Sequence, residues 1–336
     1  MLFRSMARSP VIAFSGGPSP ASRYRNAYQE IEDFSQYDAT TKMNVRVEDP
    51  TRLPDLLQRA FREATTVAPG PVHLELRQHH GDVTLAEGEY NAVIDAKYKS
   101  VPPYRTPSDG AAVGEALKLL AAAQRPVIVA GGGVAWSQAQ AEVVALAEKL
   151  QIPVATSLNA KGTILDTHPL AVGVIGLYSR ACANKTVAEA DLVFFIGSQT
   201  GGQVTSGWKV PMMGTPVIHL DIDAREIGRN YDTKVGLLGD ARTVLRQMLD
   251  LDPGAAQLGE GVGGLPAVGE DAVGDGAVRH GHERVDTAGG GTVAPLQVVA
   301  GPPVGAGDDE RLRPLAVVER AGQLALRDRK STRLNS

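Results

Sequence analysis

A short apolar run followed by glycine and then by a helical stretch recurs between residues 125 and 250. The first copy reads Arg125-Pro-Val-Ile-Val-Ala-Gly-Gly-Gly133, and a later copy reads Pro216-Val-Ile-His-Leu-Asp-Ile-Asp223, ahead of Gly239 and Asp240. Apolar runs without polar alternation are typical of parallel strands that helices cover on both faces. Their alternation with helices predicts an α/β fold with a doubly wound parallel sheet of about five or six strands.

The elements of this sheet are expected within residues 107–252. A helix capped by Ser108 opens the segment and runs through Val113, Ala116, Leu117 and Leu120. Apolar runs predict strands at 127–130, 153–155, 192–196, 217–220 and 235–238. Helices are expected at about 138–150, near 180–188, briefly after Asp223, and at 241–249, with a long loop between the second strand and the helix near residue 180.

A second α/β segment precedes this one at residues 6–77. Strands are expected at 11–14, 43–47 and 71–77. Between the last two lies a helix whose apolar face recurs at helical spacing, through Leu53, Leu56, Leu57, Ala60, Phe61 and Ala64. Residues 78–106 carry charge, Tyr and Pro without sustained periodicity and are interpreted as an interdomain linker. The pair His79 and His80 has no further ligand at metal-binding spacing, so no metal site is predicted.

Composition excludes several classes of protein. The net charge of -4 offers no basic surface for nucleic acid. No window approaches the roughly 18 uninterrupted apolar residues of a membrane span. The single cysteine excludes an internal disulfide framework and suits a reducing cytosol, so a cytoplasmic protein is expected. Cys182 lies in a predicted helix interior and is assigned to core packing.

Both ends of the chain have an unusual sequence. Residues 2–5 and 328–331 back-translate to nearly reverse-complementary DNA, and residues 328–336 also fit a common sequencing-library adapter. Residues 1–5 and the extreme end are therefore treated as adapter-derived and left out of fold reasoning. The tail at 253–336 is expected to be irregular, because residues 253–327 lack Ile and all aromatic residues. A frame-shifted reading of GC-rich DNA and a disordered linker both account for it.

Candidate ligand-binding residues follow the ends of the predicted strands, where the ligands of doubly wound sheets bind. Glycine lets a ligand approach the backbone closely, and a helix that follows it can direct free N–H groups at a phosphate. Each position also has a structural interpretation as a tight turn, a helix cap or a solvated charge. The candidates are Gly131, Gly132, Gly133, Thr156, Ser157, Leu158, Lys161, Gly176, Gly197, Ser198, Gln199, Asp221, Ile222, Asp223, Gly239 and Asp240.

Several motifs resemble those of thiamine diphosphate-dependent enzymes, and most of all the acetolactate synthase branch. These are Pro126-Val-Ile-Val-Ala-Gly-Gly-Gly-Val134, the run from Leu146 to Gly162, His168-Pro-Leu170 and His219-Leu-Asp-Ile-Asp-Ala-Arg-Glu-Ile-Gly228. Upstream, Ala27-Tyr-Gln-Glu30 and Pro69-Gly-Pro-Val-His-Leu-Glu-Leu76 resemble the end of that family's pyrimidine-binding domain. The resemblance implies a Rossmann-like, DHS-like central domain at 107–252, preceded by part of a pyrimidine-binding domain at 6–77.

The resemblance implies a carboligase or decarboxylase that acts on a small 2-keto acid with thiamine diphosphate and Mg²⁺. Gln29 matches the motif glutamine on the substrate side. The family's activating glutamate has no counterpart after residue 6, and its Gly-Asp-Gly to Asn-Asn motif has none either, since Gly274-Asp-Gly276 is followed by no Asn pair. The chain alone is therefore expected not to turn over. The intact parent is expected to be a homo-oligomer, because the family builds its active site between subunits.

The resemblance also implies a cofactor in the central domain, where the acetolactate branch binds FAD. The segment that matches the family's Gly-Ala-Arg-Phe-Asp-Asp-Arg reads Gly197-Ser-Gln-Thr-Gly-Gly-Gln203 here and lacks both arginines, which are donors suited to a pyrophosphate. FAD, ADP, a CoA moiety and an empty cleft all remain open. Two alternatives remain for the whole: a nucleotide-binding module without catalysis, and another thiamine branch acting on oxalyl-CoA, sulfoacetaldehyde or aromatic keto acids.

Overall fold

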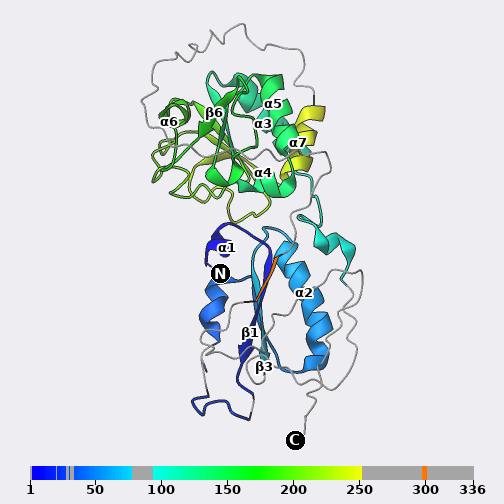
Figure 1. The fold of residues 1–336 in the computed structure, drawn as a ribbon. Helices are drawn as coiled ribbons and strands as arrows, with labels where there is room; N and C mark the ends of the chain where they lie inside the picture. Colours follow the sequence, from blue (N-terminus) through cyan, green and yellow to red (C-terminus); the bar gives the residue numbers. More distant parts are fainter. Residues whose placement is uncertain are drawn as a thin grey trace, which may run out of the picture.

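Two α/β lobes make up the computed structural model, which describes residues 2–19, 21–27, 30, 34–77, 94–251 and 297–300. The N-terminal lobe comprises residues 2–77 and 297–300, and the central lobe comprises residues 107–251 (Figure 1). Each lobe is built on one parallel sheet, of four strands in the first and six in the second. In the described part of the chain, no helix is long and apolar enough to cross a membrane.

The N-terminal lobe follows the predicted order of strand, strand, helix and strand. After a short helix α1 (Leu2–Met6) come β1 (Val11–Gly17), β2 (Met43–Val47), α2 (Leu53–Thr65) and β3 (Val72–Arg77), with single turns η1 (Ser35–Thr40) and η2 (Pro50–Arg52). The helical periodicity is confirmed, because Ala60 and Ala64 are buried and the four larger apolar residues of the same face pack against their cluster. The residues excluded as adapter-derived include the start of α1.

One strand falls inside the tail for which the sequence predicts no regular element. Strand β10 (Gln297–Ala300) pairs in parallel with β1, and the sheet order is β10-β1-β3-β2. The backbone N–H and C=O groups along that edge of β1 would otherwise have no strand partner. The periodicity argument missed β10 because pairing at an edge needs only a short extended segment. The rest of the tail lies outside the described residues.

The central lobe is the doubly wound sheet predicted from the sequence. Its strands are β4 (Pro126–Ala130), β5 (Val154–Thr156), β6 (Ala171–Val174), β7 (Leu192–Ile196), β8 (Val217–Asp221) and β9 (Thr233–Leu238), in the spatial order β6-β5-β4-β7-β8-β9. In chain order within the lobe this is 3-2-1-4-5-6, the order typical of dinucleotide-binding folds. The connections reverse direction between β4 and β7, which are neighbours in the sheet.

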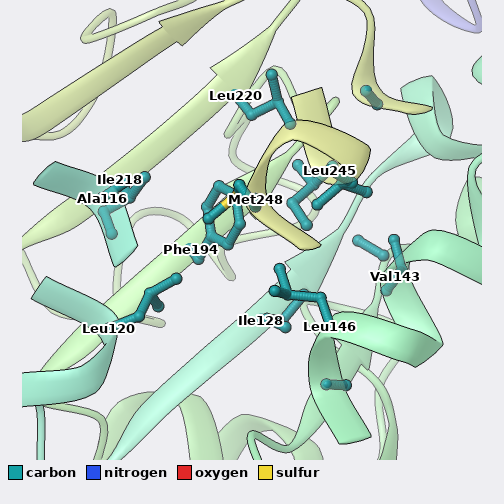
Figure 2. Packing of buried hydrophobic residues seen from close by; sticks show 14 of the residues in the cluster. Ala116, Leu120, Ile128, Val143, Leu146, Phe194, Ile218, Leu220, Leu245 and Met248 are labelled. Carbon is teal, nitrogen blue, oxygen red and sulfur yellow. The ribbon is translucent and has the colours of Figure 1, made fainter. Parts of the chain in front are cut away.

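Helices cover both faces of this sheet, which explains why its strands are apolar throughout. Ile128 and Phe194 pack into the larger cluster, beneath α3 (Gly110–Ala122), α5 (Gln140–Leu150) and α7 (Ala241–Asp250) (Figure 2). Val129 and Phe195 point the other way, into the cluster that includes Ala183 and Val187 of α6 (Ala181–Ala188). Burying apolar surface on both faces contributes roughly 25 cal/mol per Å² to folding.

Several predicted boundaries in the central lobe are wrong. Asp109, not Ser108, caps α3, since its carboxylate accepts from the N–H groups of Ala111 and Ala112. The helix expected from residue 138 is preceded by a separate helix α4 (Gly132–Ser137), which ends where Gln138 adopts a left-handed conformation. The long loop contains the short turn η5 (Leu158–Ala160) and the edge strand β6. The segment after Asp223 forms turns instead of a helix.

Two further outcomes concern Cys182 and the predicted linker. Cys182 is exposed, so its assignment to core packing is wrong: α6 turns this position outward while Ala183 and Val187 face the sheet. Of the predicted linker, residues 94–106 are described and include the turn η4 (Ala96–Lys99). Arg105, near its end, contacts the central lobe through an ion pair of 2.9 Å with Asp240. His79 and His80 lie outside the described residues.

Candidate functional site

The switch point between β4 and β7 opens into a cavity of about 450 Å³. Loops that follow all six strands, β4 to β9, form its central-lobe wall, so six strand ends contribute to one site. This volume lies within the range of small-molecule and cofactor sites. The predicted residues that line it are Gly131, Gly132, Gly133, Ser157, Leu158, Gly197, Ser198, Gln199, Asp221, Ile222, Gly239 and Asp240.

The N-terminal lobe and the linker close the other side of this cavity. Met6, Ala7 and Arg8 of the first segment contribute to the wall, together with residues 67–69 between α2 and β3 and residues 101–102 of the linker. Phe3, in the stretch treated as adapter-derived, also lies along it. Trp136 and Tyr178 add aromatic surface. The site therefore combines apolar walls with a few polar side chains, which is the usual composition of a ligand pocket.

Four predicted site residues lie off the cavity wall. Thr156 is buried at the end of β5. Lys161 is exposed and its Nζ lies 3.2 Å from Asp166, so the interpretation as a solvated charge holds. Gly176 packs against the backbone of Gln203. Asp223 forms an ion pair of 2.7 Å with Arg225. Gln29 lies outside the described residues.

The glycines at the ends of β4 and β7 are required by contact between the two loops. A Cβ on Gly131 would lie 2.2 Å from the carbonyl oxygen of Gly197, and a Cβ on Gly133 would lie 2.7 Å from the Cα of Gly197. The N–H of Gly133 donates to that same carbonyl at 2.9 Å. Gly197 has a positive φ of 59°, which also favours glycine. Close backbone packing between the two loops, which differs from both the ligand contact and the tight turn considered from the sequence, thus accounts for these three glycines.

Asp240 holds three parts of the structure together. Its carboxylate accepts from Ser137 Oγ at 2.5 Å and from Arg105 Nη1 at 2.9 Å, and it caps α7 through the N–H of Thr243 at 3.1 Å. Ser137 Oγ also accepts from the N–H of Arg242 at 2.9 Å. Asp240 therefore lines the cavity mainly as a structural residue, which caps α7.

Asp221 is the buried carboxyl group at the end of β8. Its side chain accepts from the N–H of Asp223 at 2.9 Å, and the residue is only 8% exposed. Burial raises the pKa of Asp221 to about 7, and the neighbouring carboxylates of Glu226 and Asp223 also act in this direction. The cavity thus contains a carboxyl group that changes charge near neutral pH, a property that is common at functional sites.

Arg8 and Glu226 are charged residues of the site that the sequence did not reveal. Arg8 precedes β1, yet its Nη2 lies 2.8 Å from Oε1 of the buried Glu226. The amide oxygen of Gln199, in the orientation that satisfies both groups, accepts from Arg8 Nε at 2.6 Å and from Nη2 at 2.7 Å. Arg8 and Glu226 are 218 positions apart in sequence, so no local pattern could have indicated the pair.

The described residues of this cavity form no metal-binding cluster. Nowhere in the described ranges do three His, Cys, Asp or Glu side chains gather closely enough to hold a metal ion. The arrangement suits recognition of an organic ligand, with an arginine, an amide and buried carboxyl groups beside backbone from six strand ends.

The sequence of the central lobe matches a known family. Residues 113–248 match the family described as thiamine pyrophosphate enzyme, central domain. The chain is 36% identical over 245 residues to a probable acetolactate synthase large subunit of Methanocaldococcus jannaschii, across 72% of this chain and 41% of that protein.

Two further relatives show the same coverage. An acetolactate synthase of Arthrospira platensis is 34% identical over 245 residues, across 71% of this chain and 42% of that protein. A glyoxylate carboligase of Escherichia coli O157:H7 is 30% identical over 243 residues, across 72% of this chain and 40% of that protein. The chain thus spans about two fifths of the length of these curated relatives. It belongs to the thiamine pyrophosphate enzymes, with residues 113–248 as their central domain.

Proposed function

We propose that the chain is part of a thiamine diphosphate-dependent carboligase or decarboxylase that acts on a small 2-keto acid and resembles acetolactate synthase. The observation that carries this proposal is the similarity over 245 residues, which is longer than the central-domain match of residues 113–248. Two kinds of relative, the acetolactate synthases and a glyoxylate carboligase, are named for carbon–carbon bond formation or its products.

The described residues do not fit thiamine diphosphate and its metal. A divalent cation that bridges a diphosphate needs several oxygen ligands, and the part of the chain that the structure covers offers no such cluster. No catalytic step is therefore assigned to these residues, and Gln29, the substrate-side candidate, is outside them. On this basis we propose that the chain does not turn over by itself.

The cavity at the switch point is proposed to bind an adenine nucleotide, with FAD, ADP and a CoA moiety as the candidates. Three features support this: the strand order, the volume of about 450 Å³, and polar side chains at the ends of β7 and β8. Asp221 would accept from ligand hydroxyl or amino groups, and Gln199 would offer an amide. The same features favour the second candidate function, a nucleotide-binding module without catalysis.

The cellular setting is part of the proposal. A homo-oligomer in the cytoplasm is expected for the intact protein, supported by the resemblance to enzymes with active sites between subunits. The single cysteine agrees with a reducing compartment. Partners other than a second copy and small molecules are not proposed.

One assay tests the catalytic proposal. The purified full chain is mixed with thiamine diphosphate, Mg²⁺ and pyruvate, and pyruvate loss and acetolactate formation are followed. No consumption is expected, and sustained turnover would contradict the proposal that the chain is inactive alone. Reading the source DNA in the other two frames after codon 250 tests the family role: Gly-Asp-Gly followed by Asn-Asn is expected. Its absence from both frames would favour the binding module.

Isothermal titration of the full chain with FAD, ADP and CoA tests the nucleotide proposal. Saturable binding of at least one of them is expected. A Gly132→Leu variant, which enlarges a residue of the cavity wall without the backbone overlap found at Gly131, serves as the blocked-site control. Equal heats for both proteins would assign the binding to another surface.

A further inference from the structure

Arg8 occupies an unusual backbone conformation at the boundary between the lobes. Its φ of 52° places it in the left-handed region that residues other than glycine, asparagine and aspartate rarely adopt. Strained residues of this kind persist where the surroundings hold them, and they cluster at ligand sites. Arg8, which belongs to the N-terminal lobe, lines a cavity whose main wall belongs to the central lobe.

The contacts of Arg8 use only one edge of its guanidinium group. Nε and Nη2 donate to Gln199, and Nη2 also donates to Glu226. Within the described part of the chain, Nη1 has no hydrogen-bond partner, and the side chain keeps 31% of its surface exposed. Arginine presents five donors in a planar fork. Two of them, on Nη1, are thus available to a group inside the cavity.

Arg8 is the one positively charged side chain among the described residues that line the cavity. Among the described lining residues the charged side chains are Arg8, Asp221, Glu226 and Asp240. Asp240 is neutralised by Arg105, and Glu226 is shared between Arg8 and Arg229, whose Nη1 lies 3.3 Å from it. Residues 197–203, in the loop after β7, contain no Lys or Arg. Arg8 is therefore the charged side chain of this cavity that can donate hydrogen bonds to an anionic group of a ligand.

We propose that Arg8 is the specificity-determining residue of the cavity and recognises the phosphate groups of a nucleotide, so that the N-terminal lobe completes a binding site of the central lobe. This inference rests on the proposed nucleotide function and deepens it. Glu226 and Gln199 act as positioning residues: they hold the Nε and Nη2 edge and leave Nη1 to the ligand. Guanidinium groups suit this role because they donate to phosphate oxygens through paired N–H bonds.

Calorimetric titration of the full chain tests the inference with four probes: adenosine, AMP, ADP and inorganic pyrophosphate. In Arg8→Ala, affinity for ADP and pyrophosphate is expected to fall by about tenfold or more, since hydrogen bonds to charged groups are lost. Adenosine affinity should change by less than about twofold. The matched control is Arg229→Ala, which removes the other arginine on Glu226 without touching the cavity wall and should bind all four probes as the unaltered chain does.

A second variant separates binding from folding. Arg8→Ala removes one of the two arginines that contact the carboxylate of Glu226. A double variant, Arg8→Ala with Glu226→Gln, also removes the charge of that carboxylate. The double variant should show the same loss for ADP and retained adenosine binding. Equal losses for adenosine and ADP, or no loss for either, would overturn the role of Arg8.

The probes also distinguish this inference from the nucleotide proposal. If the unaltered chain binds pyrophosphate but no adenine compound, and Arg8→Ala abolishes that binding, Arg8 is supported and the adenine proposal fails. If the chain binds adenosine and ADP and Arg8→Ala changes neither, the nucleotide proposal stands and the role of Arg8 is wrong. If the unaltered chain binds none of the four probes, both are overturned.

Discussion

Replacing Gly131 with alanine is expected to destabilise the central lobe through one contact. The new Cβ would lie 2.2 Å from the carbonyl oxygen of Gly197 and 2.7 Å from the Cα of Ser198. Both are backbone atoms, so no side-chain rotation can relieve the overlap. The backbone of Gly131 itself is ordinary, with φ of -101°, and alanine could adopt it. The effect is therefore one of packing and not of glycine's conformational freedom.

The expected loss follows from the shift that this overlap demands. Overpacking a well-packed interior costs about 1–3 kcal/mol. Separating the loops also weakens the hydrogen bonds of 2.8 Å from the N–H of Gly131 to Ile196 and of 2.9 Å from Gly133 to Gly197, and each is worth about 1 kcal/mol. A total of about 3 kcal/mol is expected. For a domain of this size it lowers the melting temperature by roughly 6–12 °C.

Thermal and urea unfolding, followed by far-UV circular dichroism, measure this loss against two controls. Gly132→Ala tests the adjacent position, where the nearest atom to a new Cβ is Asn159 Cβ at 3.4 Å, and should be nearly neutral. Gly114→Ala lies within α3 with nothing within 4 Å and should stabilise by about 0.5–1 kcal/mol. If Gly131→Ala unfolds at the same temperature as Gly132→Ala, the loops are not in backbone contact and the explanation of these glycines is wrong.

Three further predictions concern the carboxyl groups and the cysteine. The pKa of Asp221 is raised to about 7 from an ordinary 3.8, so the folded state holds a proton that the unfolded chain releases, and stability from this site is lost as pH rises from about 4 to about 7. In urea unfolding, the stability of Asp221→Asn relative to the unaltered chain should therefore increase between pH 5 and pH 8. A difference in stability that stays constant over this range would contradict the prediction. Asp240→Ala should lower the free energy of unfolding by about 3–5 kcal/mol, because it removes the partner of Arg105 and the α7 cap. The control Asp232→Ala, which breaks an exposed ion pair with Lys234, should lower it by less than about 1 kcal/mol in the same unfolding experiments. Cys182 should react with a thiol reagent in the folded protein as fast as in urea to within about tenfold, and protection by several orders of magnitude would restore its assignment to the core.

Strand and helix positions were predictable wherever the local pattern and the tertiary environment agree. Strand β7 has the predicted bounds because five consecutive apolar residues need two covered faces, and both exist. Helix α2 was predicted by spacing alone, since one face meets the sheet. The doubly wound order followed from alternation of strands with helices.

The errors share a cause, which is dependence on contacts that sequence spacing does not encode. Strand β6 was taken for loop because it is a short edge strand whose residues are only partly buried. Helix α6 presents Cys182 to solvent, and only the orientation of the packed helix decides that. The pairing of Arg8 with Glu226 joins the two lobes across most of the described chain, so neither residue carried a signal.

The strand-end glycines first indicated a ligand, and the structure gives them a different physical role. Gly131, Gly133 and Gly197 let two loops pack backbone to backbone, which builds a rigid wall at the switch point. A wall of this kind supplies shape but no charge. Discrimination between ligands must then come from polar side chains at its edge, and in this cavity these include Gln199 and Arg8, which already contact each other. We therefore expect the glycine-rich strand ends to shape the proposed ligand site, and Arg8 from the other lobe to decide which ligand binds there.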